Sequence, residues 1–152
     1  MLDMGELGSV CRQMSPLIER ASGSEADVIT TAAASARLHS FYSEIEKIFA
    51  LIARKYDNRV PNSSAWHKEL LIQMSQSTPA RPPVITPYVV DALGDYLAFR
   101  DLFRETAVTL MRWDKLAPLL ARVPEVTGEL TIALAIFAHH LASSGDTASP
   151  PL

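Results

Sequence analysis

Apolar residues recur at helical spacing along most of this chain. The clearest stripe lies in residues 88–116, where apolar positions at steps of three, four and seven share one side of a helix. Its members are Val89, Ala92, Tyr96, Phe99, Phe103 and Leu110. Pro87 is a favoured first-turn residue and Thr86 can cap it, so the helix is predicted to begin there. The rest of the chain is expected to pack around this helix.

The longest helical pattern covers residues 25–56 and contains no Gly or Pro. Ser24 is predicted to cap this helix, with Asp27 lying near the positive helix end. The apolar positions that keep the helical period are Val28, Ala32, Leu38, Phe41, Ile45, Ile48, Phe49 and Ile52.

Shorter amphipathic patterns predict further helices on both sides. Residues 7–20 form one, in which Pro16 predicts a kink or a late start, and residues 66–74 form another, capped by Ser63 or Ser64. Asp114 is predicted to cap a helix that Pro124 ends or kinks. In a last helix the inward positions are predicted to be Leu130, Leu134, Phe137, Ala138 and Leu141.

These patterns predict an all-α fold, an antiparallel bundle of four to five helices. No segment has the pattern of a strand, and the proline-rich residues 78–83 are expected to form a rigid bridge across the bundle. Residues 1–142 are expected to form a single domain, because too little chain lies on either side of the bridge for two cores. The Ser-, Gly- and Pro-rich residues 143–152 are expected to be a disordered tail.

Charge and cysteine content narrow the class of protein. A formal net charge of -3 over 152 residues argues against bulk electrostatic binding of nucleic acid or of an anionic membrane, but it leaves room for a local basic groove. Cys11 is the single cysteine, so no intrachain disulfide can form and a reducing cytoplasm is expected. The acidic start does not resemble a signal peptide, and no apolar run reaches membrane-spanning length.

Searches for catalytic or metal-binding motifs find none. His39, His67, His139 and His140 lack the spacing of a zinc helix, and adjacent histidines point about 100° apart, so one of His139 and His140 is expected to face the core. No metal or cofactor is expected, since nucleophile elbows and phosphate-binding glycine loops are also missing. Arg100 and Arg104, four positions apart, form a polar helix face that is either solvated or chemically active.

Three stretches, taken in order, resemble the HepT-like branch of the HEPN superfamily of small all-helical proteins. They are residues 38–53, residues 66–74, and residues 93–119, which end in Arg112-Trp-Asp-Lys-Leu-Ala-Pro-Leu119. The resemblance spans roughly residues 25–142. It implies a homodimeric, metal-independent endoribonuclease toxin whose cleft lies between the protomers. It also implies an antitoxin partner, an MNT-type nucleotidyltransferase that nucleotidylates a tyrosine of the toxin.

The family motif is Arg, four to six residues, His, one residue, and Tyr, and this chain keeps only part of it. Arg100 matches the arginine that holds the scissile phosphate, but Glu105 stands at the histidine position and Ala107 at the tyrosine position. Arg104 remains as a second cation that can hold phosphate. Since losing a general acid or base costs about 10²–10⁴-fold in rate, weak or no ribonuclease activity is expected.

Three functions are compatible with these residues. The first is a HepT-like protein with an eroded ribonuclease site that dimerises and binds or regulates a nucleotidyltransferase-fold partner. The second is an active endoribonuclease toxin that uses Arg100 and Arg104 with Glu105 as base. The third is a structural helical protein in which both arginines only form salt bridges, each worth less than about 1 kcal/mol at a surface.

Overall fold

The computed structural model describes residues 4–145, most of which are helical. The helices are α1 (Gly5–Arg20), α2 (Val28–Ile52), α3 (Trp66–Ser75), α4 (Pro87–Glu105) and α5 (Trp113–Gly145). A π-helical turn, η1 (Ala53–Asp57), continues α2, and a 3-10 turn, η2 (Val108–Leu110), lies between α4 and α5. The described part of the chain has one isolated β-bridge, between Thr78 and Arg81, and no strand, so the predicted all-α class is confirmed.

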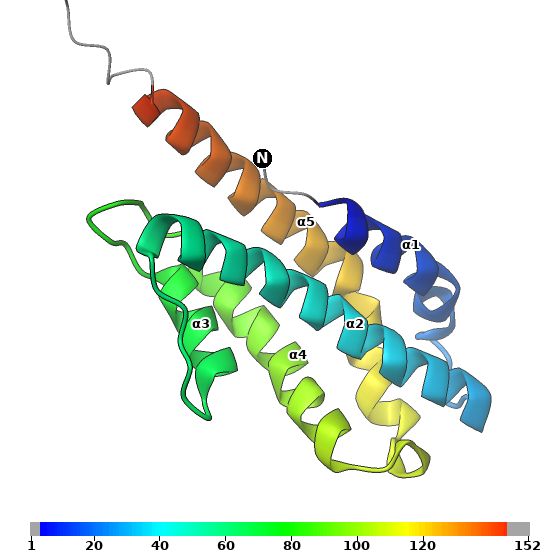
Figure 1. The fold of residues 1–152 in the computed structure, drawn as a ribbon. Coiled ribbons are helices and arrows are strands. Elements are labelled where there is room, and N and C mark those ends of the chain that lie inside the picture. The colour runs from blue at the N-terminus through cyan, green and yellow to red at the C-terminus, as the bar shows by residue number, and fades with distance from the viewer. Residues whose placement is uncertain (1–3, 146–152) are drawn as a thin grey trace, which may run out of the picture.

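The four long helices run alternately up and down, and the short α3 packs at one end (Figure 1). α2 lies at the centre of the bundle and contacts each of the other four helices. α4 and α5 also contact each other, so α2, α4 and α5 enclose most of the core. The described residues form five α-helices, and the prediction was four to five.

Aromatic and aliphatic side chains from all five helices form one hydrophobic cluster. The ring of Phe41 on α2 meets the ring of Tyr96 on α4 edge-on, with centroids 5.2 Å apart. The Tyr96 hydroxyl donates a hydrogen bond to the Leu119 carbonyl on α5 at 2.7 Å, so this buried polar group has a partner. These contacts fix the three central helices to one another. Of the apolar stripe predicted within residues 88–116, Val89, Ala92, Tyr96 and Phe99 are confirmed as buried.

Side-chain caps begin two of the helices. Thr86 accepts from the Val89 N–H at 3.3 Å, as predicted for α4. The prediction of Ser24 for α2 is wrong, because Asp27 accepts from the Thr30 N–H at 2.6 Å and α2 therefore begins at Val28. Val28 is consequently outside the core, with 73% of its surface exposed.

α3 begins without a side-chain cap, contrary to prediction. Its N-cap residue is Ala65. Ser63 accepts from the Ala65 N–H instead and donates to Glu69 at 2.7 Å.

The central helix α4 ends at Glu105, eleven residues before the predicted end at position 116. Thr106 is extended and its N–H closes the last turn on the Leu102 carbonyl at 2.9 Å. Residues 106, 108 and 109 are β-branched, which lowers helix propensity, and Trp113 must turn back to donate from its indole to the Gly23 carbonyl. Leu110, predicted to face the core, is therefore 70% exposed.

α5 is a single helix, although two helices were predicted here. Pro118 lies near its start, and Pro124, predicted to end or kink it, lies in its interior. Both prolines are exposed, while Leu120, Val123 and Val126 on the opposite side are buried. Burial of this side offsets the missing backbone hydrogen bonds, which cost about 3 kcal/mol in a helix interior. Pro16 is likewise exposed within a continuous α1.

Three further expectations about α5 are wrong. His139 and His140 are both exposed, so neither faces the core, and Ala138 is exposed as well. α5 continues through Gly145, so the predicted tail is helical over residues 143–145. The remainder of that tail lies outside the described residues. No helix within residues 4–145 combines the length and apolar character that crossing a membrane requires.

Candidate functional site

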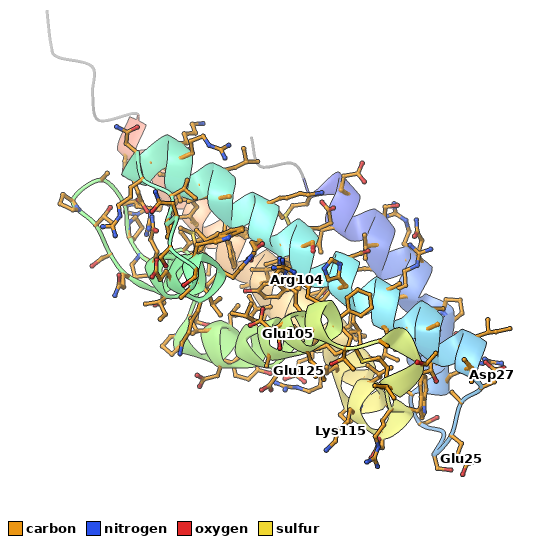
Figure 2. All side chains as sticks on the ribbon, turned by 60° about the horizontal axis from the view of Figure 1, so that its bottom comes forward. Glu25, Asp27, Arg104, Glu105, Lys115 and Glu125 are labelled. Carbon is orange, nitrogen blue, oxygen red and sulfur yellow. The ribbon has the colours of Figure 1, made fainter. Side chains whose placement is uncertain are left out.

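Arg100 and Arg104 lie in the last turns of α4, and their side chains leave the helix on nearly the same side. Arg100 is buried, with 9% of its surface exposed, whereas Arg104 is exposed. Figure 2 shows Arg104 on the side of α4 that faces α2. The two guanidinium groups, called the arginine pair below, therefore lie along the boundary between α4 and α2.

The charge of Arg100 is poorly compensated. Its Nη1 lies 3.5 Å from a carboxylate oxygen of Asp101, at the limit of a hydrogen bond, and Asp101 itself is exposed. The Arg100 Nε is buried and has no hydrogen-bond partner. Arg104 forms no ion pair within residues 4–145. A buried cation with only a long contact to an exposed carboxylate is poorly stabilised, so this site favours an added anion.

Arg81 shows how the same fold compensates a buried arginine fully. Its guanidinium donates to both carboxylate oxygens of Asp57 at 2.6 and 2.7 Å. It also donates to the carbonyls of Gln73, Gln76 and Pro82. Arg81, in the loop after α3, therefore has a structural role, whereas the Nε of Arg100 on α4 has no hydrogen-bond acceptor.

Glu105 and Ala107 do not complete the site around Arg100. Glu105 is the last residue of α4, and five helical positions place its side chain about 140° away from that of Arg100. Figure 2 shows Glu105 displaced from the α2 side of the helix that Arg104 occupies. Ala107 lies beyond the helix and is exposed. Thus α4 and the turn after it bring the two arginines together but bring no imidazole or phenol to them.

An imidazole does reach the site, from α2. The ring of His39 packs against the ring of Phe103, with centroids 4.9 Å apart and planes tilted by 36°. Phe103 lies between Arg100 and Arg104 in the sequence of α4. Burial lowers the pKa of His39 below its usual value, and the positive charges of Arg100 and Arg104 lower it further. His39 is therefore neutral at pH 7 and can accept a proton.

His39 was not among the residues predicted for this site. The sequence carries one signal for it: His39, Tyr42 and Glu46 follow each other at steps of three and four along α2. Such a row marks one helix face, and the ring contact with Phe103 places the His39 end of this row against α4. Burial, together with the charge of Glu46, raises the pKa of the Tyr42 phenol, so Tyr42 stays protonated.

The other histidines are engaged elsewhere or lie far from the arginine pair. His67 bonds through Nδ1 to the buried Glu46 at 2.6 Å, and the Trp66 ring stacks on it with centroids 3.5 Å apart. His139 and His140 lie in the last turns of α5, at the opposite end of the bundle from the C-terminal end of α4 (Figure 1). The Glu46–His67 pair therefore ties α3 to α2, next to the row that contains His39.

Other chemistry in the described residues is limited. Burial raises the pKa of the Cys11 thiol, which lies 3.7 Å from the Thr127 hydroxyl, so it is a poor nucleophile. No three His, Cys, Asp or Glu side chains within residues 4–145 come together as metal ligands.

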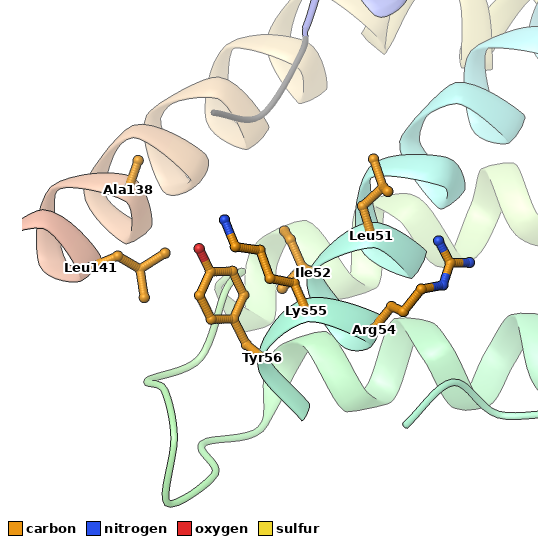
Figure 3. A pocket seen from close by; sticks show the side chains of 7 residues that line it. All are labelled: Leu51, Ile52, Arg54, Lys55, Tyr56, Ala138 and Leu141. Atoms are coloured by element: carbon orange, nitrogen blue, oxygen red, sulfur yellow. The ribbon is translucent and has the colours of Figure 1, made fainter. Parts of the chain in front are cut away.

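A hollow of about 440 Å³ lies between the end of α2, the turn η1 and the end of α5. Figure 3 shows Lys55 and Tyr56 directed across it towards Leu141. The Lys55 ammonium lies over the Tyr56 ring, 5.2 Å from its centroid. The hollow is mainly apolar and contains no group of the arginine pair, so it is separate from the candidate site.

Comparison with known proteins identifies the family. The sequence model of the family described as HepT-like protein matches residues 33–141, which include His39, the arginine pair and Glu105. Searches of curated proteins and of solved structures find no match. The matched residues cover α3, α4 and most of α2 and α5. The chain therefore belongs to the HepT-like family of HEPN toxin–antitoxin proteins.

Proposed function

We propose that this HepT-like chain binds a phosphate group of RNA at the arginine pair and works as a dimerising partner of an MNT-type nucleotidyltransferase. The observation that carries the proposal is the buried guanidinium of Arg100, whose Nε has no partner and whose nearest carboxylate is 3.5 Å away. A phosphate offers several charged acceptor oxygens, and arginine binds them with paired hydrogen bonds. Arg104, exposed on the same helix face, adds a second cation.

The motif on α4 lacks the histidine and the tyrosine of the family, and the histidine is the residue that would transfer protons. Glu105 replaces the imidazole and Ala107 replaces the phenol that the family uses. A carboxylate at position 105 would repel a phosphate rather than shuttle protons beside it. Ala107 has no oxygen to accept a nucleotidyl group, so silencing at this position cannot occur. The nucleotidyltransferase would then regulate the chain by binding.

The geometry supports phosphate binding better than the two other functions considered. Glu105 leaves α4 about 140° from Arg100, which is unsuitable for a base acting on the same phosphate. A purely structural role would require ion pairs, but Arg100 has one long contact with an exposed carboxylate. Arg81 meets that structural description instead, with its bidentate contact to Asp57.

Fluorescence anisotropy with labelled single-stranded RNA tests the phosphate site. Arg100→Met should weaken binding by about tenfold or more, because a hydrogen bond to a charged group contributes about 1.5–3 kcal/mol. Arg12→Met, which removes an exposed arginine of α1, is the matched control and should bind as wild type does. Equal affinities of the two variants would refute the site.

The partner is tested separately. The chain is co-expressed with an MNT-type nucleotidyltransferase, and the mass of the purified complex is measured by light scattering. A dimer of the chain bound to the nucleotidyltransferase is expected. A monomer that recovers no such protein would rule out the regulatory part of the proposal and leave the RNA site standing.

A further inference from the structure

The hollow between the end of α2, the turn η1 and the end of α5 has the size and lining of a small-molecule site. Its volume is about 440 Å³, and pockets for small ligands typically measure about 300–1,000 Å³ and are mostly apolar. Ile52 is buried beneath it, whereas Leu51 is 51% exposed on one side. Ala138 on α5 contributes only a methyl group, so the space opposite η1 stays open.

The π-helical turn η1 directs polar groups into this hollow. The Asn58 N–H bonds to the Ala53 carbonyl five positions earlier, and such turns are rare and frequently occur at functional sites. Figure 3 shows the Lys55 ammonium and the Tyr56 hydroxyl on the side of η1 that faces the end of α5. The Tyr56 ring packs edge-on against Phe137, with centroids 5.7 Å apart and planes at 90°. This contact holds the phenol in place at the hollow.

The polar groups at the hollow lack partners, and its charges are all positive. Arg54 and Lys55 are exposed and form no ion pair within residues 4–145. The Tyr56 hydroxyl forms no hydrogen bond in the same part of the chain. No carboxylate lines the hollow, and the neighbouring Asp57 carboxylate is already bound by Arg81. A complementary ligand therefore has an apolar body and an anionic group.

We propose that this hollow binds a small amphipathic anion, an aliphatic chain that ends in a carboxylate or phosphate head group. The chain packs against Ile52 and Leu141, and each methylene that it buries contributes about fourfold in affinity. Lys55 and Tyr56 hold the head group with hydrogen bonds, which a charged acceptor strengthens. Arg54, on the Leu51 side of the hollow in Figure 3, adds positive charge at the rim.

This site is independent of the arginine pair. The last turns of α5 lie at the opposite end of the bundle from the C-terminal end of α4 (Figure 1). The mainly apolar lining also distinguishes the hollow from a surface that binds the backbone of a nucleic acid. Binding of the amphipathic anion and binding of RNA can therefore succeed or fail separately.

Isothermal titration calorimetry of the full chain tests the ligand class, with each probe kept below its micelle concentration. Decanoate and decyl phosphate share a chain and differ in the head group, so the tighter of the two identifies the preferred anion. Saturable binding at one site is expected. Decanol, which has the chain without the charge, should bind about tenfold more weakly or worse. Acetate, which has the charge without the chain, should not bind measurably.

Two variants with matched controls locate the binding. Ala138→Trp fills the hollow and should abolish binding, whereas Ala135→Trp, at another exposed alanine of α5 outside the lining, should bind as wild type does. Lys55→Met should weaken binding of the anion about tenfold or more. Lys68→Met, at an exposed lysine of α3, is its control.

Circular dichroism melts check that each variant is folded, and RNA anisotropy should be the same for all of them as for wild type. The proposal is overturned if neither anion binds saturably, or if decanol binds as tightly as decanoate. It is also overturned if each variant and its control have equal affinities. Loss of RNA binding by wild type would refute the phosphate site and leave this hollow standing.

Discussion

The imidazole of His39 on α2 and the ring of Phe103 on α4 are in contact, with centroids 4.9 Å apart. Phe103 lies two residues before the end of α4, where a helix would otherwise fray. The contact therefore fixes the last turn of α4, and with it the arginine pair, against the central helix.

This contact predicts the effect of replacing Phe103 with another apolar residue. Phe103→Leu keeps most of the apolar burial but removes the ring contact, so the free energy of unfolding should fall by about 0.5–1.5 kcal/mol. Urea unfolding followed by circular dichroism measures the change. Leu102→Ala, at the exposed neighbouring position, should change it by less than about 0.5 kcal/mol. Equal losses in the two variants would show that the ring contact adds no stability.

Arg104→Ala tests how many phosphate contacts the site makes. Because Arg104 is exposed and forms no ion pair in the described residues, its removal should leave the fold unchanged. One phosphate contact fewer should reduce the slope of log affinity against log salt by about 0.7 for single-stranded RNA. The measurement is an RNA titration at several salt concentrations. Lys115→Ala, an exposed lysine of α5, serves as the control.

Sequence patterns predicted the helical class and most of the core, because apolar periodicity reports directly on which face a helix buries. They failed where tertiary contacts override local rules. Pro124 was expected to break α5, yet the buried side formed by Leu120, Val123 and Val126 keeps the helix continuous. The bond from the Trp113 indole to the Gly23 carbonyl joins residues 90 positions apart, so no local pattern could place the end of α4.

The sequence predicted only the part of the candidate site that lies on a single helix. Arg100 and Arg104 share a face of α4, and their spacing alone showed this. The burial of Arg100 and the lack of a partner for its Nε depend on packing between helices. The approach of His39 requires the register of α2 against α4, which side-chain periodicity does not determine. Sequence reasoning therefore assigned no imidazole to this site and did not consider His39 on α2.

Glu105→His restores the family motif at one position, and it should tighten the binding of RNA. The change removes a carboxylate that opposes phosphate binding and adds a group that titrates near neutrality. Because position 105 lies about 140° from Arg100 around α4, the gain is expected in affinity and not in proton transfer to the same phosphate. Fluorescence anisotropy with labelled RNA gives the affinity. Glu129→His, an exposed position on α5, should show no gain.

The protonation of His39 predicts a pH dependence of stability. Its pKa in the folded protein is lower than its usual value of 6.5, so below that pH the unfolded chain binds more protons. The contribution of His39 to stability is thus fully present above pH 6.5 and is lost as the pH falls below it. His39→Gln cannot titrate, so its free energy of unfolding should change less between pH 7.5 and about pH 5. Parallel pH slopes for wild type and variant would contradict the lowered pKa.

The two buried arginines should respond in opposite ways when each is replaced by methionine, which has a similar reach and no charge. Arg81→Met removes the arginine partner of the buried Asp57 carboxylate and the donor to three backbone carbonyls. The free energy of unfolding is therefore expected to fall by about 3–5 kcal/mol. Arg100→Met removes a cation that has one long contact, and stability should stay level or rise by up to about 2 kcal/mol. Urea unfolding at neutral pH compares both variants with wild type. Such a difference would mean that Arg100 is kept at a cost to folding, as expected for a residue whose counter-charge arrives with a ligand, whereas equal losses would indicate that Arg100 is already compensated within the fold.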